Sequence, residues 1–342
     1  MAHYPHPHGA AAAAPAPAGT TAGPGPPDLA ALKAGGIIRQ TQKDRFTVRL
    51  KCPGGRMSLA RLARILEVAR RYGRKDVHLS VRQSIEIPYV LGRHLDAVRQ
   101  ELAGVGQEIA SCGARVRAPT ACAGCEYNPK GLTDTQRMVR EVTDRFFGRA
   151  GIGHKFKMAF SGCPNDCPHT SSNDLGFQGA VEPGWNAALC NACGLCAQAC
   201  REGAIVQDDA ASGPRWLRAK CVYCGDCLRS CPTGACRAQR TGWMVRAGGK
   251  HGRHPVTGAK IAEFLPDEKV PEVIEAVLAW YAKAGQGRGR IRLSDLLLEG
   301  DNWKRFAASL APVLGEWAVQ HPPPMRNEIH GSGSRATHTD GG

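Results

Sequence analysis

With 342 residues and 42% hydrophobic side chains, the chain is long enough for two or three globular domains. No apolar run reaches the length of about 18 residues that a membrane span requires, which excludes a membrane helix. The formal charge of +15 suits an anionic partner, but an aromatic content of 6% and the lack of a helix-turn-helix, zinc-finger or RNP pattern argue against nucleic acid. A polycarboxylate cofactor or a small anionic substrate fits this charge equally well.

Both ends of the chain have the composition of disordered tails. Residues 1–27 contain no Lys or Arg and are broken by prolines, so they resemble neither a signal peptide nor a transit peptide. Residues 320–342 are rich in Pro, Gly, Ser and His. Fifteen cysteines without an export signal predict a cytoplasmic protein that uses thiolates for metal rather than for disulfides. We expect no membrane partner and no nucleic-acid partner.

The first ordered region, residues 28–110, has the pattern of a small α+β unit. Alternating apolar residues predict strands over residues 46–50 and 77–87. Ser58 is predicted to cap a helix, and a second helix is expected over residues 91–102. The first helix is expected to bury Leu59, Leu62, Ala63, Leu66 and Ala69. The order β-α-β-β-α suggests a sheet covered by two helices.

The second region, residues 111–187, carries two cysteine pairs. They are Cys122-x2-Cys125 and Cys163-x3-Cys167, and between them a capping box over residues 133–136 predicts a helix that runs to Gly148. Four thiolates are the number that one [4Fe–4S] cubane requires. The alternative is that these cysteines are buried structural thiols.

The third region, residues 188–237, repeats one cysteine motif. It reads Cys190-x2-Cys193-x2-Cys196-x3-Cys200 and then Cys221-x2-Cys224-x2-Cys227-x3-Cys231-Pro232, which is the pattern of bacterial-type ferredoxins with two [4Fe–4S] clusters. In this pattern the fourth cysteine ligates the other cluster. One predicted set is therefore Cys190, Cys193, Cys196 and Cys231, and the other is Cys221, Cys224, Cys227 and Cys200.

Two other uses of these cysteines fit the motif less well. A disulfide framework needs an oxidising compartment, to which nothing in the sequence points. Zinc sites use two cysteine pairs around one ion, which would leave half of each motif without a role. The chain then resumes with a glycine-rich basic loop over residues 248–255 and an amphipathic helix from Val270 that ends before Gly285. The ferredoxin segment is therefore interpreted as an insertion, with residues 238–319 completing the interrupted domain and adding C-terminal helices.

At this point the sequence resembles the siroheme-dependent sulfite and nitrite reductase family, in particular the anaerobic and dissimilatory-like branch with an inserted ferredoxin. The matching segments occur in family order over about residues 37–285. They are residues 48–55 (VRLKCPGG), 79–83 (LSVRQ), 113–117, 155–157 (KFK), 161–167 (SGCPNDC), 173–177 (NDLGF) and 248–250 (GGK). The resemblance implies an α+β fold of siroheme/[4Fe–4S] reductase half-domains, with residues 28–110 as a ferredoxin-like half-domain and residues 111–187 and 238–319 as the siroheme domain.

The resemblance also implies roles for single residues. In the family, one cysteine thiolate is shared between a [4Fe–4S] cluster and the siroheme iron, which by position is Cys167, with Cys122, Cys125 and Cys163 completing the cluster. Basic side chains bind the substrate anion and supply protons, which by position are Lys51, Arg117, Lys155 and Lys157. Arg49 and Arg82 match residues that pair with siroheme carboxylates, as buried carboxylates require. The implied cofactors are siroheme and three [4Fe–4S] clusters.

The sequence departs from the family at two positions. The first cysteine pair is commonly Cys-x5-Cys, which would place a ligand where this chain has Asn128, so Cys125 is taken as the substitute. The family asparagine after the active-site arginine is here Ala118. Weaker basic candidates are Arg115, Lys250 and Arg253, and Cys52, Cys112 and Cys236 are interpreted as packing residues.

The resulting hypothesis is a siroheme enzyme that reduces sulfite to sulfide by six electrons. Nitrite reduction to ammonia is the nearest alternative, and an electron carrier that has lost siroheme is the second. No nicotinamide or flavin fingerprint occurs, which implies a separate electron-donating reductase subunit or ferredoxin. Family enzymes contain two copies of the siroheme-binding half and this chain contains one, so a homodimer or hetero-oligomer is expected. The alternative is a monomer whose ferredoxin insert covers the site.

Overall fold

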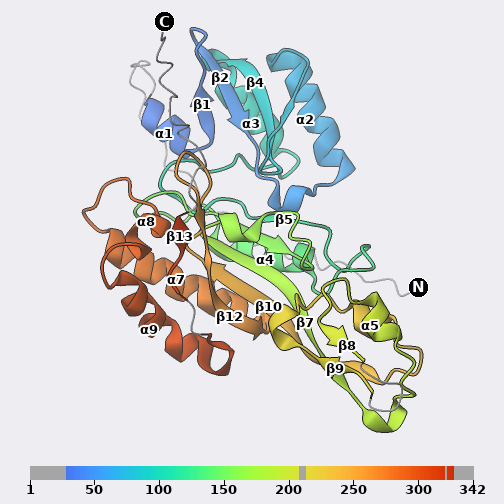
Figure 1. Ribbon diagram of the computed structural model, residues 1–342. Helices are drawn as coiled ribbons and strands as arrows, with labels where there is room; N and C mark the ends of the chain where they lie inside the picture. Colours follow the sequence, from blue (N-terminus) through green and yellow to red (C-terminus); the bar gives the residue numbers. More distant parts are fainter. Residues whose placement is uncertain (1–27, 208–212, 320–321, 327–342) are drawn as a thin grey trace, which may run out of the picture.

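The computed structural model describes residues 28–207, 213–319 and 322–326. An N-terminal α+β unit rests on a larger unit built around a five-stranded sheet, and a cysteine-rich segment extends from the far end of that sheet (Figure 1). The predicted tail over residues 1–27 lies outside the described residues. Within them, no helix is long and apolar enough to cross a membrane.

The N-terminal unit is a four-stranded antiparallel sheet in the order β1-β2-β4-β3. The helices α2 and α3 contribute the other half of its core, which confirms the expected sheet with two helices. Its elements are α1 (Leu29–Ala34), β1 (Ile37–Arg39), β2 (Arg45–Arg49), α2 (Leu59–Tyr72), β3 (His78–Leu79), β4 (Ile85–Leu91) and α3 (Leu95–Ala103).

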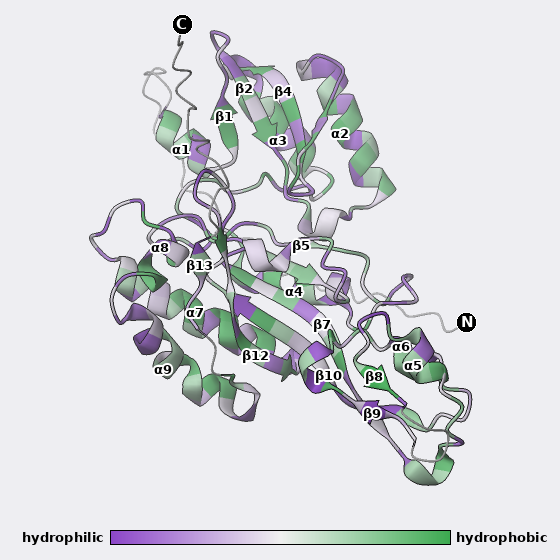
Figure 2. Cartoon of the chain, in the orientation of Figure 1, coloured by the Kyte–Doolittle hydropathy of each residue, from purple (hydrophilic) through white to green (hydrophobic). Residues whose placement is uncertain are grey.

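Two local expectations in this unit are wrong. Ser58 does cap α2, but the helix is turned so that Ile65, Val68 and Ala69 are buried, while Leu59 is 83% exposed. The hydrophobic and hydrophilic residues that alternate along α2 are visible in Figure 2. The predicted strand over residues 77–87 is a hairpin, because the chain reverses between β3 and β4. As a result Val81 lies in a turn and is fully exposed rather than half-buried.

The second unit is a mixed sheet in the order β12-β10-β7-β6-β5. The strands β5, β6 and β7 run parallel, whereas β10 is antiparallel to both of its neighbours. Phe177 and Trp243 face the main core, and the next residues in alternation, Ala180 and Met244, face a smaller cluster on the other side. The bounds are β5 (Thr120–Ala121), β6 (Met158–Ser161), β7 (Leu175–Trp185), β10 (Cys236–Ala247) and β12 (Ala259–Leu265).

Four helices complete the main core: α4 (Thr135–Phe146), α7 (Val270–Gly285), α8 (Leu293–Leu297) and α9 (Asn302–Leu314). The predicted helices near α4 and α7 are confirmed. However, Asp134 rather than the first residue of the proposed capping box is the N-cap of α4, and it accepts a hydrogen bond from the backbone N–H of Arg137. Gln136 does not close a box, because its amide donates to the carbonyl oxygens of Gly54 and Cys122. It therefore ties α4 to the N-terminal unit.

The cysteine-rich segment lies between β7 and β10 and contains α5 (Leu195–Ala199), α6 (Asp226–Arg229) and the antiparallel pair β8 (Ile205–Val206) and β9 (Arg215–Trp216). The expected C-terminal tail is wrong for two of its residues. Met325–Arg326 form the strand β13, which pairs with β11 (Val256–Thr257). The remainder of residues 320–342, apart from 322–324, lies outside the described residues.

Candidate active site and cysteine cavities

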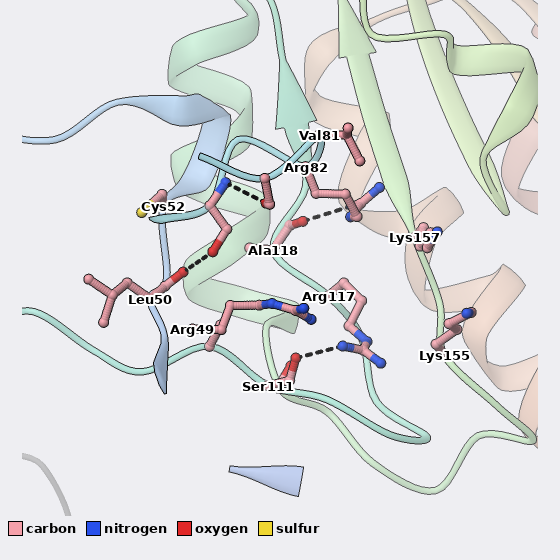
Figure 3. A pocket seen from close by; sticks show the side chains of 13 residues that line it. Arg49, Leu50, Cys52, Val81, Arg82, Ser111, Arg117, Ala118, Lys155 and Lys157 are labelled. Carbon is pink, nitrogen blue, oxygen red and sulfur yellow. Dashed lines mark hydrogen bonds between the residues drawn. The ribbon is translucent and has the colours of Figure 1, made fainter. Parts of the chain in front are cut away.

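A strongly basic cavity, with an empty volume of about 800 Å³, lies between the N-terminal unit and the edge of the five-stranded sheet. Figure 3 shows the charged ends of Arg49, Arg117 and Lys155 directed toward a common space. Two further cations, Arg82 and Lys157, line the same cavity. Five of the predicted site residues are thus brought together from four separate parts of the chain.

The two arginines of the N-terminal unit are held by the β2–β4 region. Arg49 ends β2, and its Nε lies 2.6 Å from a carboxylate oxygen of Glu86, while its Nη1 lies 3.2 Å from the sulfur of Cys112. Arg82 sits in the turn between β3 and β4 and donates to the carbonyl oxygen of Ala118 at 3.0 Å. The neighbouring Gln83 has a positive φ of 58° and exchanges two hydrogen bonds with the backbone of Ala121, which fastens this turn to β5.

The other three cations belong to the main unit. Arg117 precedes β5 and donates to the carbonyl oxygens of Ser111 and Gly113, at 2.8 and 3.1 Å, while its buried Nε has no partner among the described residues. Lys155 and Lys157 precede β6. Neither ammonium group makes a hydrogen bond or ion pair within the described part of the chain, so both are available to an anion.

Crowded positive charge and burial disfavour the protonated forms of these groups. Burial, with help from Arg82, Lys155 and Arg292, lowers the pKa of Lys157 to about 8. Burial likewise lowers the pKa of Lys155, and that of Arg82 to about 10. An anion in the cavity would offset the repulsion among the cations, because it compensates buried positive charge. The cavity is therefore suited to a small oxyanion or a set of carboxylates.

Lys51, predicted to bind the substrate with the other cations, does not line this cavity. Its ammonium group lies 2.7 Å from a carboxylate oxygen of Glu108 and 4.7 Å from the ring centre of Phe147. It lines a different cavity, together with Arg56 and Arg140. The backbone N–H of Lys51 donates to the carbonyl oxygen of Glu108, and the Glu108 carboxylate and the Phe147 ring hold the ammonium group away from the basic cavity.

The four cysteines of the main unit lie near the other ends of β5 and β6. The backbone N–H of Gly162 donates to the sulfur of Cys122 at 3.1 Å, and the thiols of Cys122 and Cys167 contribute to the raised pKa of Cys163, after burial as the larger cause. These three are therefore close together. Burial and then Asp134 raise the pKa of Cys125, and none of the other three thiols is among the causes. The pKa of Cys125 therefore gives no indication that its thiol lies beside those of Cys122, Cys163 and Cys167.

The cations and the cysteines thus occupy opposite ends of the same parallel strands. Arg117 precedes β5 and Cys122 follows it, and Lys157 precedes β6 and Cys163 follows it. Five residues separate the first pair and six the second, which corresponds to roughly 16 and 20 Å of extended backbone. Within one chain, the basic cavity is therefore well separated from the Cys122–Cys163–Cys167 group.

The eight cysteines of the inserted segment gather around two cavities. One, with an empty volume of about 280 Å³, is lined by Cys190, Cys193, Cys196 and Cys231. The other, of about 340 Å³, is lined by Cys200, Cys221, Cys224 and Cys227. Each cavity collects one of the two sets that the spacing predicted, including the exchanged fourth cysteine. No group of three or more His, Cys, Asp or Glu within the described residues converges on a single metal ion. Thiolates set around a space are what a cubane core requires.

The second of these cavities is the one nearer the main unit. Val181 of β7 lines it, and a Cβ added to Gly225 would approach both Val181 and Leu132. Leu132 in turn donates its backbone N–H to the carbonyl oxygen of Gly162. The Cys200–Cys227 cavity is therefore connected through Leu132 to the residues next to Cys163.

Comparison with known proteins agrees with this architecture. Residues 112–306 match the nitrite and sulphite reductase 4Fe-4S domain, and residues 38–105 match the nitrite/sulfite reductase ferredoxin-like half domain. The chain belongs to the nitrite and sulphite reductase family.

Similarity to individual proteins covers part of their length. The chain is 36% identical over 264 residues to the coenzyme F420-dependent sulfite reductase of Methanocaldococcus jannaschii, a match that covers 77% of this chain and 42% of that protein. It is 27% identical over 172 residues to one subunit of the anaerobic sulfite reductase of Salmonella typhimurium, a match that covers 46% of this chain and 50% of the Salmonella protein. The fold resembles that of dissimilatory sulfite reductase I, with a TM-score of 0.64 and 20% identity over 84% of this chain and 73% of that one.

Sequence reasoning missed two residues of the basic site, Asp174 and Arg292. Asp174 is fully buried and forms a salt bridge of 2.7 Å with Arg292. Asp174 lies inside residues 173–177, a segment that resembles the family, so the resemblance could have identified it. Arg292 lies in a loop 135 residues after Lys157, and no motif marks it.

The separate positions of Lys51 and Lys155 give a direct test. We expect Lys155→Ala to weaken nitrite binding about tenfold or more, because it removes a charge-assisted contact from the basic cavity. Lys51→Ala should change the nitrite dissociation constant less than about twofold, and lower the free energy of unfolding by about 1 kcal/mol or less through loss of the Glu108 pair. Calorimetric titration and denaturant unfolding of both variants measure this. A comparable loss of nitrite affinity in Lys51→Ala would return this residue to the site.

Proposed function

We propose that this protein is a siroheme enzyme that reduces sulfite to sulfide by six electrons. The observation that carries the proposal is the basic cavity, in which two unpaired lysines and three arginines converge in a fold that also gathers cysteines for iron–sulfur clusters. Two relatives whose names include sulfite reductase support the choice of substrate. The chloroplastic nitrite reductase of Zea mays, at 27% identity, is less similar to this chain than the Methanocaldococcus jannaschii enzyme at 36%.

The residues present fit the implied cofactors. Arg49 and Arg82 offer guanidinium groups to siroheme carboxylates, and the partnerless Nε of Arg117 is a buried donor that still needs an acceptor. Cys122, Cys163 and Cys167, with Cys125 as the fourth candidate, would hold one [4Fe–4S] cluster, and the two four-cysteine cavities of the insert would hold two more. When bound, siroheme and the clusters would supply a metal site for the anion and one-electron transfer.

The protein's own residues would bind the anion and manage its protons. Lys155, Lys157 and Arg117 present N–H donors to the oxygens of sulfite, which orients the anion and compensates its charge. Removal of oxygen as water needs protons. With a pKa of about 8, the Lys157 ammonium gives up a proton more readily than an ordinary lysine does. As pH rises through about 8, the cavity loses this positive charge, so anion binding should weaken there rather than above 10.

The site is proposed to be shared between two chains, either two copies of this chain or this chain and a related subunit. The basis is the separation of roughly 16 and 20 Å between the cations and the cysteines along β5 and β6. A group bound through Cys167 is held at the end of these strands opposite to Lys157. Cys167 itself is exposed, as a ligand at an interface between chains would be. A separate reductase subunit or ferredoxin is the proposed electron donor.

Two alternative functions are each supported by one observation. Nitrite is also a small anion with oxygen atoms that the same cavity would accept. An electron carrier without siroheme is motivated by Asn128, which occupies the usual second ligand position. Against the carrier stands the cost of keeping several unpaired cations around one cavity, which electron transfer through the insert would not need.

Steady-state reduction of sulfite and nitrite with a reduced dye tests the reaction. We expect anaerobically purified protein to show the visible bands of siroheme and to turn over sulfite with the higher kcat/KM. Higher kcat/KM with nitrite would replace the substrate assignment. Cluster-replete protein without siroheme bands and without turnover of either anion would favour the electron carrier.

Cysteine substitutions separate the three proposed clusters. We expect intact protein to contain about twelve cluster irons and one siroheme iron per chain. Cys190→Ser and Cys231→Ser should each remove about four irons and give the same electron paramagnetic resonance spectrum, because both residues line one cavity. Cys167→Ser should abolish activity and siroheme coupling while the insert keeps its clusters. Cys52→Ala, which lies outside all three sets, is the control and should retain all iron. Sulfite turnover by Cys167→Ser would disprove its bridging role.

Mixed oligomers test the shared site. A Cys167→Ser chain and a Lys155→Ala/Lys157→Ala chain should each be inactive alone. If one site takes its cysteines from one chain and its lysines from the other, mixing should restore about a quarter to a half of the activity in hetero-oligomers. Light scattering should show at least two chains. An active, siroheme-loaded monomer would contradict the proposal.

A further inference from the structure

Asp174 is a fully buried carboxylate beside the basic cavity. It directly precedes β7, and both of its oxygens are occupied. Oδ2 accepts the backbone N–H of Lys157 at 2.8 Å and Nη2 of Arg292 at 2.7 Å. Oδ1 accepts from Nη2 of Arg292 at 2.8 Å and from its Nε at 3.3 Å. The carboxylate therefore joins the start of β6 to the C-terminal segment.

The side chain of Arg292 is held by contacts within the protein rather than surrounded by water. It precedes α8, and its side chain is only 12% exposed. The adjacent Leu293 is completely buried in the main core, which fixes the backbone from which the guanidinium reaches Asp174. The bidentate pair is of the kind that holds geometry as well as charge. It fixes a cation close to Lys155 and Lys157 although Arg292 does not itself line the cavity.

We propose that Asp174 and Arg292 form a positioning pair that fixes Lys157 at the start of β6 and determines the charges around its ammonium group. This inference rests on the proposed function only in taking Lys157 as an oxyanion-binding group. Asp174 and Arg292 are positioning residues, since they act through Lys157 rather than on the substrate.

The charges around Lys157 give the direction of the effect. Burial is the largest cause of its lowered pKa, followed by Arg82, Lys155 and Arg292, while Asp174 acts in the opposite sense. Arg49 and Arg117 face it across the cavity. Removing Arg292 deletes one repulsive cation and leaves Asp174 without its strongest partner, so both changes favour the protonated lysine. Removing the charge of Asp174 deletes the one attraction, so the protonated lysine is disfavoured further.

Competitive labelling of the lysines tests this without depending on turnover. The full-length protein is treated briefly with an amine acylating reagent between roughly pH 6 and pH 11, and peptide mass spectrometry follows the modification of Lys157. Its rate reports the unprotonated fraction, with a midpoint expected near 8. Arg292→Gln should move this midpoint up by roughly half a unit or more, and Asp174→Asn should move it down. Arg292→Lys should restore most of the original value.

Controls separate positioning from general damage. The exposed Lys304 in the same digest should titrate unchanged in every variant. Arg288→Gln breaks an exposed pair with Glu299 and should leave the Lys157 midpoint where it is. If Asp174→Asn does not fold, the contrast between Arg292→Gln and Arg292→Lys still decides. Midpoints that stay fixed, or that move the same way in Arg292→Gln and Asp174→Asn, overturn the inference. Shifted midpoints in a protein that does not reduce sulfite would uphold it and reject the proposed function.

Discussion

The parallel pairing of β5, β6 and β7 is the constraint on which the site depends. Parallel strands all begin at one end of the sheet and all finish at the other. Residues that precede the strands therefore lie near one another, and residues that follow them lie near one another at the opposite end. Arg117, Lys157 and Asp174 precede the three strands in turn, while Cys122 and Cys163 follow two of them. One feature of topology thus creates both a cationic edge and a thiol edge, and keeps them apart.

Most of the partners that orient the cationic side chains are neutral. Arg117 donates to two carbonyl oxygens, and Arg82 donates to a carbonyl and to the side-chain oxygen of Asn173. Carbonyls fix the direction of a guanidinium without cancelling its charge. Carboxylates would cancel the charge that an incoming anion is meant to compensate. The exceptions are Glu86, which pairs with Arg49, and Asp174, which pairs with Arg292. The cavity therefore keeps its positive charge, which lowers the stability of the folded protein. Binding of an anion would restore that stability.

Sequence information predicted the cysteine sets better than the basic site, for a physical reason. Cluster ligands follow from spacing along short loops, and both inserted sets indeed line common cavities, including Cys200 and Cys231, which are exchanged between motifs. Strand and helix types were also largely readable from apolar periodicity. The rotation of α2 was not, because Leu59 and Ile65 are equally apolar and only tertiary contacts select between them. The position of Lys51 depends on Glu108 and Phe147, two contacts distant in sequence that no local pattern indicates. Arg292 joins through a contact distant in sequence that leaves no local pattern.

The insert is positioned by the same sheet that positions the site. The strands β7 and β10 pair along their whole length, from Leu175 opposite Ala247 to Trp185 opposite Cys236, so the cysteine-rich segment is the elaborated end of one long hairpin. Glu182, almost completely buried in this hairpin, accepts from Arg218 of the insert and from Arg240 of β10, both at 2.5 Å. A buried carboxylate with two cationic partners resists separation, since removing either partner leaves charge uncompensated. The insert is therefore fastened to the sheet rather than tethered by a linker. The strand pairing and these ion pairs together hold the cysteine-rich segment at a fixed position relative to the sheet.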